Sequence, residues 1–258
     1  MDTRYWGPSG WGLLHLIVAN PNLSKSDIHA FLKELPYVLP CKWCRRNLTL
    51  HYEDLPFEGV DDFEKWMWQI HNKVNGILHK KQPSPTLAAT RKTYSERFAY
   101  GCTKTEFPGW EFLFSIVKDH PIQKGNQLIP NAPPVETLET DLEKNKWNAL
   151  TPAERFAHWQ AFWNALPAVF PYAEWTTVWK ECIDDKESSD PTSWKTSGDA
   201  MKGLWKLRCK FEEKLSLLNK TSYKALCNDL TFYRSGCASR ANKSQTCRRL
   251  RQTRKPQR

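Results

Sequence analysis

The chain of 258 residues lacks a long apolar run, and its N-terminus lacks the charged and then apolar leader of a secretory signal. A membrane-spanning helix needs about 18–20 predominantly apolar residues, and no stretch approaches that length. Neither a membrane span nor a signal peptide is therefore predicted, and a cytoplasmic location is expected. Eight cysteines without a secretory signal also argue against an extracellular disulfide framework, and they favour thiol chemistry in a reducing compartment.

Acidic residues are missing from the C-terminal end of the chain, where basic residues accumulate and contribute to a net charge of +10. The basic cluster consists of Arg248, Arg249, Arg251, Arg254, Lys255 and Arg258. Because this segment has no apolar periodicity, residues 233–258 are predicted to form a basic, disordered tail. Contact between the tail and nucleic acid or another polyanion is the alternative that the charge leaves open.

Helical patterns dominate the remainder of the sequence. Apolar residues recur at helical spacing in four segments of the first hundred residues, with short connections between them. The first expected helix covers residues 10–20, and the second is capped by Ser26 or Asp27 and ends near residue 39. The third covers residues 41–52, and the fourth is capped by Asp61 or Asp62 and ends near residue 78. A short fifth helix is expected over residues 85–99. This pattern predicts an all-α fold in which residues 1–101 form a four-helix bundle plus a short fifth helix.

Two motifs of this bundle carry chemistry. Cys41-Lys42-Trp43-Cys44 stands at the start of a predicted helix, where free N–H groups and the positive end of the helix dipole favour thiolates. His71-Asn72-Lys73-Val74-Asn75 lies inside the fourth helix, so that His71 and Asn75 share one face. A face that offers imidazole, carboxamides and apolar carbon suits a flat, partly polar heterocycle. Together the two motifs suggest a flavin beside a disulfide.

The dithiol motif alone leaves other chemistries open. Zinc could be bound by Cys41, Cys44 and two of the histidines His15, His51 and His71, although no second closely spaced pair of ligands follows. A flavin-free thiol–disulfide exchanger would need a strand before its C-x-x-C motif, and the pattern predicts helices. A scaffold protein with a defunct site and a polyanion-binding tail is the third alternative.

The second half of the chain repeats the first half in the same order. Residues 109–117 echo 10–18, residues 161–171 echo 30–40, and residues 204–215 give a weaker match to 67–78. Apolar residues persist, whereas Tyr172 and Trp175 stand where Cys41 and Cys44 stand in the first copy. Residues 102–232 are therefore predicted to form a degenerate helical copy that has lost its redox site.

Three stretches of the first half resemble the Erv/Alr family of FAD-linked sulfhydryl oxidases. They are W-G-P-S-G-W-G-L-L-H at 6–15, Y-V-L-P-C-K-W-C at 37–44 and H-N-K-V-N-G-I-L-H-K at 71–80, in the family's order and approximate spacing. The resemblance covers about residues 4–95, and it is greatest to the versions carried by large DNA viruses. A viral origin would place the protein in the host cytoplasm, a viral factory or the virion. The resemblance implies FAD at the mouth of the bundle, protein thiols as substrates, and O2 as the electron acceptor that yields H2O2.

The resemblance also assigns roles to single residues. Cys44 would be the sulfur nearest the flavin, and Cys41 would face incoming thiols. The implied cofactor contacts are Gly7, Pro8, Ser9, Trp11, His15, His71, Asn72, Val74, Asn75, Leu78, Lys80 and Tyr94, the last as a substitute for the family's adenine-stacking aromatic residue. No metal is expected.

The chain departs from the family in its cysteines, since none lies between Cys44 and Cys102. The second disulfide that family members commonly carry is therefore absent, and packing alone must hold the helix junction. Cys237 and Cys247 are either idle thiols of the tail or a shuttle disulfide that relays electrons to Cys41. The degenerate copy is expected to imitate a family-type homodimer within one chain, or to add contacts to a true homodimer.

Overall fold

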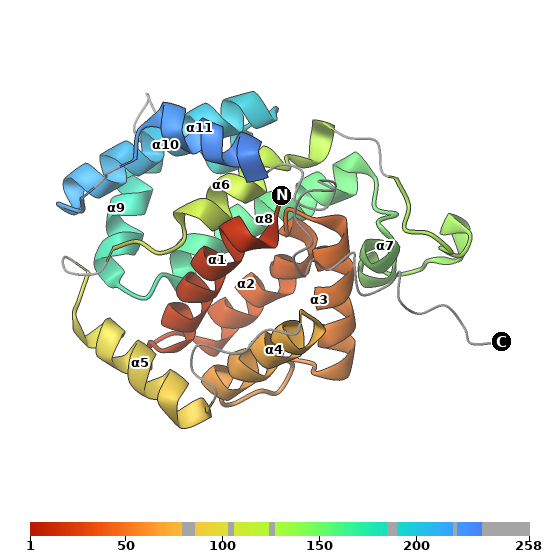
Figure 1. The fold of residues 1–258 in the computed structure, drawn as a ribbon, viewed down its shortest axis with the longest axis horizontal. Coiled ribbons are helices and arrows are strands. Elements are labelled where there is room, and N and C mark those ends of the chain that lie inside the picture. The colour runs from red at the N-terminus through yellow and green to blue at the C-terminus, as the bar shows by residue number, and fades with distance from the viewer. Residues whose placement is uncertain (79–85, 103–105, 124–126, 185–189, 219–220, 234–258) are drawn as a thin grey trace.

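The computed structural model of the chain describes residues 1–78, 86–102, 106–123, 127–184, 190–218 and 221–233, in which helices are joined by loops and no strand occurs (Figure 1). The α-helices are α1 (Thr3–Val18), α2 (Lys25–Val38), α3 (Lys42–Asp54), α4 (Phe63–Ile77), α5 (Leu87–Ala99), α6 (Trp110–Lys118), α7 (Asp141–Trp147), α8 (Pro152–Ala165), α9 (Ala173–Asp184), α10 (Ser197–Lys214) and α11 (Tyr223–Phe232). Four 3-10 turns cover Pro121–Gln123, Val135–Thr137, Leu166–Val169 and Pro191–Ser193. The all-α prediction is confirmed.

Local sequence signals explain where the first helices begin. The N-cap of α3 is Cys41, as predicted, and the Asp62 carboxylate caps α4 by accepting a hydrogen bond from the Lys65 N–H at 2.9 Å. Helix α1 begins well before the predicted residue 10, because the buried Asp2 carboxylate accepts from the Arg4 N–H at 2.9 Å and caps it. Helix α2 begins just after Ser24, before the expected caps, and its first backbone bond joins the Ile28 N–H to the Ser24 carbonyl.

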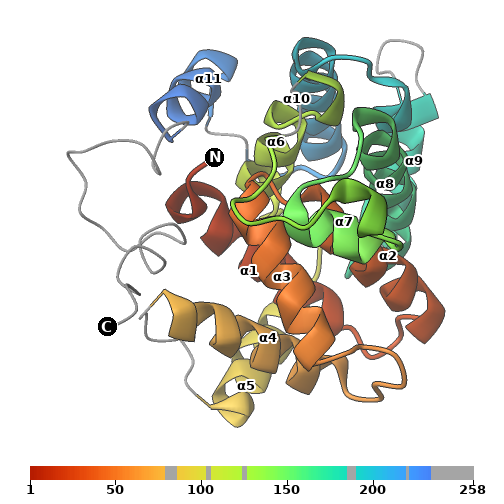
Figure 2. The ribbon, with the colours of Figure 1, turned by 90° about the vertical axis from the view of Figure 1, so that its right-hand side faces the viewer.

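Helices at equivalent positions of the two halves pack against each other: α1 against α6, and α2 against α8 (Figures 1 and 2). The contacts are reciprocal. A Cβ on Gly10 would lie 3.3 Å from the Phe112 ring, and a Cβ on Gly109 would lie 2.6 Å from Leu13 Cδ2. In the repeat, Gly10 corresponds to Gly109 and Leu13 to Phe112. Small residues on both helices therefore allow two equivalent backbones to approach closely.

The core of the molecule is continuous across the two halves. Buried residues of α1–α4, of α6 and of α8–α11 belong to a single hydrophobic cluster. At its centre the rings of Phe31 and Phe162, which are equivalent in the repeat, lie 5.5 Å apart between centroids. The predicted boundary between residues 101 and 102 thus divides two copies that share one core.

The segment between α6 and α8 is longer than the connection between α1 and α2, and it contains α7. This segment lies along α3, the helix that begins at the cysteine pair (Figure 2). The Arg46 guanidinium stacks over the Trp147 ring at 4.1 Å, and the Asn145 side chain donates to the Pro36 carbonyl and the Thr49 hydroxyl. The second half therefore braces the helix that follows the dithiol.

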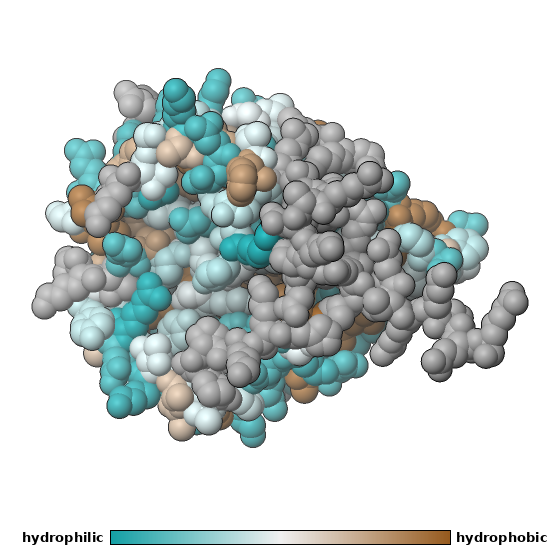
Figure 3. Space-filling model, viewed as in Figure 1, coloured by the Kyte–Doolittle hydropathy of each residue, from teal (hydrophilic) through white to brown (hydrophobic). Residues whose placement is uncertain are grey.

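The outer surface is mainly polar. On one face, hydrophilic and intermediate residues cover most of the described surface, with apolar side chains scattered among them (Figure 3). In the parts of the chain that the structure describes, no helix has the length and apolar character needed to cross a membrane. The compartment expected from the sequence stays a prediction. Of the predicted tail, 233–258, the structure describes Tyr233, which is the C-cap of α11 and accepts the Asp2 N–H at 3.0 Å; residues 234–258, with Cys237 and Cys247, lie outside the described residues.

Candidate active site

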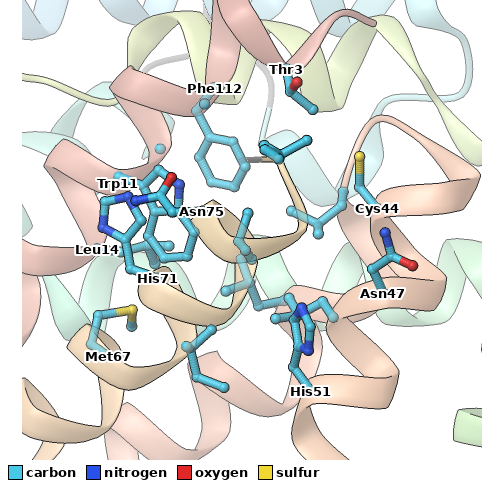
Figure 4. Close-up of a pocket in the computed structure, with 18 of the residues that line it drawn as sticks. Thr3, Trp11, Leu14, Cys44, Asn47, His51, Met67, His71, Asn75 and Phe112 are labelled. Atoms are coloured by element: carbon cyan, nitrogen blue, oxygen red, sulfur yellow. The ribbon is translucent and has the colours of Figure 1, made fainter. Parts of the chain in front are cut away.

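A cavity of about 340 Å³ is lined mainly by residues of α1, α3 and α4 (Figure 4). Tyr94 of α5 and Phe112 of α6 also line it. Its volume falls in the range of small-molecule and cofactor sites. Most of the lining is apolar, from Leu14, Leu48, Met67 and Ile70 among others. The cavity therefore suits a flat apolar body that carries a few polar groups.

The two cysteines of the dithiol have different surroundings. Cys44 is buried in the first turn of α3 and lines the cavity, whereas Cys41 is only partly buried and does not line it. In Figure 4, Cys44 and Asn47 stand on one side of the cavity, and Trp11, His71 and Asn75 stand on the other. A cofactor in the cavity would contact Cys44, and a thiol arriving from solvent would meet Cys41.

Aromatic rings form a stack at the end of the cavity away from the dithiol. The Trp11 indole lies parallel to the His71 imidazole at 4.0 Å between centroids, and His15 stacks on Tyr94 at 4.9 Å. His15 Nε2 and His71 Nδ1 are hydrogen-bonded at 2.9 Å, so one ring donates and the other accepts. Trp11 and His15 come from one sequence motif on α1, His71 comes from another on α4, and Tyr94 lies on α5; the fold brings them together.

Both histidines are neutral at physiological pH. Burial lowers the pKa of His15 to about 4. Burial, and then the nearby His15, lowers the pKa of His71 to about 3. On the opposite wall, burial and then Lys73 lower the pKa of His51 to about 4. The cavity therefore presents neutral imidazoles, which can donate or accept hydrogen bonds at an uncharged ring system.

Three polar atoms of the lining have no hydrogen-bond partner within the described part of the chain: Trp6 Nε1, His51 Nε2 and Asn75 Nδ2. A buried polar atom without a partner costs about 1–3 kcal/mol. FAD has ring carbonyls, hydroxyls and phosphates that can satisfy such donors, and its ring system suits the aromatic stack. The residues present therefore fit this cofactor.

Most of the predicted contact residues line the cavity. They are Gly7, Pro8, Trp11, Cys44, His71, Val74, Asn75, Leu78 and Tyr94. His15 lies instead on a smaller adjoining pocket, which it shares with Tyr94 and Arg91. The Ser9 hydroxyl donates to the Pro108 carbonyl at 2.6 Å and accepts from the Phe112 N–H, so Ser9 joins α1 to α6. Asn72 lines neither pocket, and Lys80 lies outside the described residues.

Sequence reasoning missed other lining residues. Asn47 and His51 stand one and two turns after Cys44 on α3, so their spacing from the cysteine was a usable signal. Phe112 lines the cavity from α6 in the second half, and no sequence pattern predicted this contact.

The zinc alternative finds no support in this arrangement. Among the residues that the structure describes, no group of three or more His, Cys, Asp or Glu side chains could hold a metal ion. His51 and His71 project from different helices at separate places around the cavity (Figure 4).

In the second half, side chains fill the region that the predicted repeat aligns with the cavity. Trp175, which replaces Cys44, is fully buried, as is Phe211, which replaces Val74. Arg208 stands in place of His71 and lies over the Trp110 ring at 5.4 Å, just as His71 lies over Trp11. The Arg208 Nε atom pairs with the Glu212 carboxylate at 3.2 Å.

A helical bundle that holds a C-x-x-C dithiol at the edge of an aromatic, partly polar cavity has the site of a flavin-linked thiol oxidase. Comparison with known proteins agrees: the model of the Erv1/Alr family matches residues 8–98. Two relatives are the mitochondrial FAD-linked sulfhydryl oxidase ERV1 of Saccharomyces cerevisiae, 31% identical over 86 residues, and the FAD-linked sulfhydryl oxidase of African swine fever virus (Kenya isolate), 34% identical over 85 residues.

The chain belongs to the Erv1/Alr family. The match spans 31% of this chain and 46% of the yeast protein, and 30% of this chain and 71% of the viral protein. No solved structure matches the chain. For the N-terminal bundle, the prediction of an FAD-linked thiol oxidase is confirmed.

Proposed function

We propose that the whole chain acts as a thiol oxidase that forms disulfide bonds in protein substrates through Cys41 and Cys44. The observation that carries this proposal is the division of the dithiol, with Cys44 on the cavity wall and Cys41 outside it. Trp11, His71, Val74 and Asn75 would hold the cofactor on the facing wall.

The steps follow from this placement. A substrate thiolate attacks Cys41 Sγ of the oxidised pair, so that a substrate–Cys41 disulfide forms, the Cys41–Cys44 bond breaks, and Cys44 leaves as a thiolate. A second substrate thiolate then attacks the substrate sulfur of the mixed disulfide and releases Cys41 as a thiolate. The free N–H groups at the start of α3 stabilise these thiolates, because Cys41 is the N-cap. FAD, when bound, would supply the chemistry that takes the electron pair from the reduced Cys41–Cys44 pair, whose disulfide re-forms, and passes it with two protons to O2, which becomes H2O2.

We also infer that the second copy replaces the partner of a homodimer. In a two-fold dimer, residue i contacts residue j of the partner and j contacts i. The Gly10–Phe112 and Gly109–Leu13 contacts have this reciprocal form, and Phe31 and Phe162 stand where a two-fold axis would pass. One redox centre per polypeptide is therefore expected, because Tyr172 and Trp175 stand where a second cysteine pair would be. Contact of the basic tail with a polyanion stays a prediction.

The absorption spectrum of the purified protein tests the cofactor. A flavin spectrum, with FAD released on denaturation, is expected, and a colourless protein would contradict the proposal. For the mechanism, Cys44→Ser should abolish oxygen consumption driven by a dithiol while the protein still binds FAD. Cys209→Ser, which changes a partly buried cysteine on α10, is the matched control and should keep full activity. Full activity of Cys44→Ser would refute the assignment.

A further inference from the structure

A buried arginine directly follows the cysteine on the cavity wall. Arg45 is only 3% exposed, and its guanidinium makes three hydrogen bonds. Nη1 donates to the Leu39 carbonyl at 2.8 Å and to Asp119 Oδ2 at 3.1 Å, and Nη2 donates to Asn148 Oδ1 at 2.8 Å. One bond thus reaches the segment before Cys41, and the other two reach the second half of the chain.

The Leu39 carbonyl links this arginine to Cys41. It accepts the backbone N–H of Cys41 at 2.8 Å as well as the Arg45 guanidinium, and the Cys41 carbonyl accepts the backbone N–H of Arg45 at 2.9 Å. The tight turn that places Cys41 at the head of α3 is therefore held by Arg45 at both of its ends. A displaced guanidinium would release the carbonyl that orients the Cys41 backbone.

The anchors of Arg45 come from the segment around α7. Asp119 follows α6, and Asn148 is the C-cap of α7, in a left-handed conformation with φ of 57°. The Asn148 side chain also donates to the Gln127 carbonyl at 3.0 Å, and that carbonyl accepts the Lys42 ammonium at 3.2 Å. The second half therefore holds the dithiol segment at two residues, Lys42 and Arg45. These anchors lie beyond residues 8–98, to which the family model extends.

The cluster around Arg45, the residue that follows Cys44, contains a second buried arginine. Arg155 of α8 lies 3.7 Å from Asp119 Oδ2, so two guanidinium groups share one carboxylate. Burial, and then the neighbouring Arg45, lowers the pKa of Arg155 to about 9, which leaves it charged at neutral pH. One positive charge of the cluster is not offset by Asp119, and a nearby cation favours a thiolate over a thiol.

We propose that Arg45 is a positioning residue for Cys41, and that Asp119 and Asn148 of the second half hold it in place. The degenerate copy would then hold Cys41 in position and contribute positive charge to its surroundings, although the copy has no redox centre of its own. This inference rests on the proposed function, in which Cys41 is the sulfur that meets the substrate.

The rate at which iodoacetamide alkylates Cys41 tests the proposal, because only the thiolate reacts. The full-length, reduced protein is treated across a range of pH, and the Cys41 peptide is quantified by mass spectrometry. Arg45→Gln removes the charge and the hydrogen bonds, so we expect the Cys41 profile to move up by about one pH unit, a tenfold slower reaction at neutral pH. Arg45→Lys keeps the charge but not the planar guanidinium, and its Cys41 alkylation profile should lie between those of Arg45→Gln and the native protein.

Asn148→Gly tests the anchor, because glycine adopts the left-handed backbone without strain and removes only the side chain. We expect alkylation at neutral pH about threefold slower than in the native protein. Lys146→Gln is the control, since Lys146 belongs to the same segment but pairs with Glu53 near the far end of α3, and its profile should not move. If the profiles of Arg45→Gln and Asn148→Gly coincide with that of the native protein, the proposal is wrong. Should Arg45→Gln fail to fold, Asn148→Gly alone decides. The measurement needs neither flavin nor turnover, so its result is separate from that of the oxidase assay.

Discussion

Phe31 and Phe162 join the two halves of the chain within one core, and we therefore expect the halves to unfold as one unit. Both side chains are fully buried, one from α2 and one from α8, with ring centroids 5.5 Å apart. Leucine retains most of the apolar volume and removes the ring contact. Each Phe→Leu change should therefore lower the free energy of unfolding by about 1–1.5 kcal/mol. The ring pair itself contributes about 0.5–1.5 kcal/mol, which should appear as a coupling energy in a double-mutant cycle.

Urea unfolding of the four proteins of the cycle provides the measurement, followed by circular dichroism and by tryptophan fluorescence. Because the core is continuous, both signals should change in a single transition. Phe57→Leu combined with Phe162→Leu is the control, since Phe57 packs on Tyr52 and Trp66 within the first half. Independent sites add to within about 0.3–0.5 kcal/mol. A Phe31–Phe162 coupling below about 0.3 kcal/mol, with separate transitions for the two signals, would refute a shared core.

Four further outcomes follow from the structure. His71→Ala removes the ring stacked on Trp11 and should weaken FAD binding at least tenfold in a fluorescence titration; an unchanged affinity would contradict the site. The folded pKa values of His15 and His71, about 4 and 3, lie below the unfolded value of 6.5, so the unfolded chain binds protons first as the pH falls. The free energy of unfolding should therefore drop between pH 6.5 and pH 4, by up to about 1.4 kcal/mol per pH unit for each histidine, and less steeply in His71→Ala. Gly203→Ala places a Cβ 2.5 Å from the Trp194 ring and should destabilise by about 1–3 kcal/mol in thermal unfolding. Gly76→Ala has open space and should stabilise α4 by up to about 1 kcal/mol.

Local signals were sufficient to predict the five helices of the first half and the His71–Asn75 face that lines the cavity. A cap such as Asp62 and an i, i+4 face such as His71–Asn75 are properties of neighbouring residues, and the structure has both as expected. The early start of α1 was missed, because the cap at Asp2 precedes the apolar pattern, and α1 contains Pro8. The helix tolerates this proline near its N-terminus.

Contacts between distant segments could not be predicted in the same way. The hydrogen bonds of Arg45 reach residues 74 and 103 positions away, and no periodicity relates Arg45 to Asp119 or Asn148. A charged residue after a C-x-x-C motif suggests a solvated helix face when only the sequence is considered. Its burial depends on the segment around α7, which has no counterpart in the first copy.

The predicted repeat allows the site of the first half to be compared with the equivalent positions of the second half, which have no cysteine pair. Trp11 with His71, and Trp110 with Arg208, occupy the same places on equivalent helices, and in both copies a polar or charged group lies over an indole. The helix geometry therefore does not require a cofactor, because the second copy maintains it with Phe211 and Trp175 in the space. What the first copy has instead is the smaller side chains of Cys44 and Val74, where the second has the rings of Trp175 and Phe211. The cavity exists because these positions were left unfilled, and a cofactor that fills it should stabilise the first half as the aromatic residues stabilise the second.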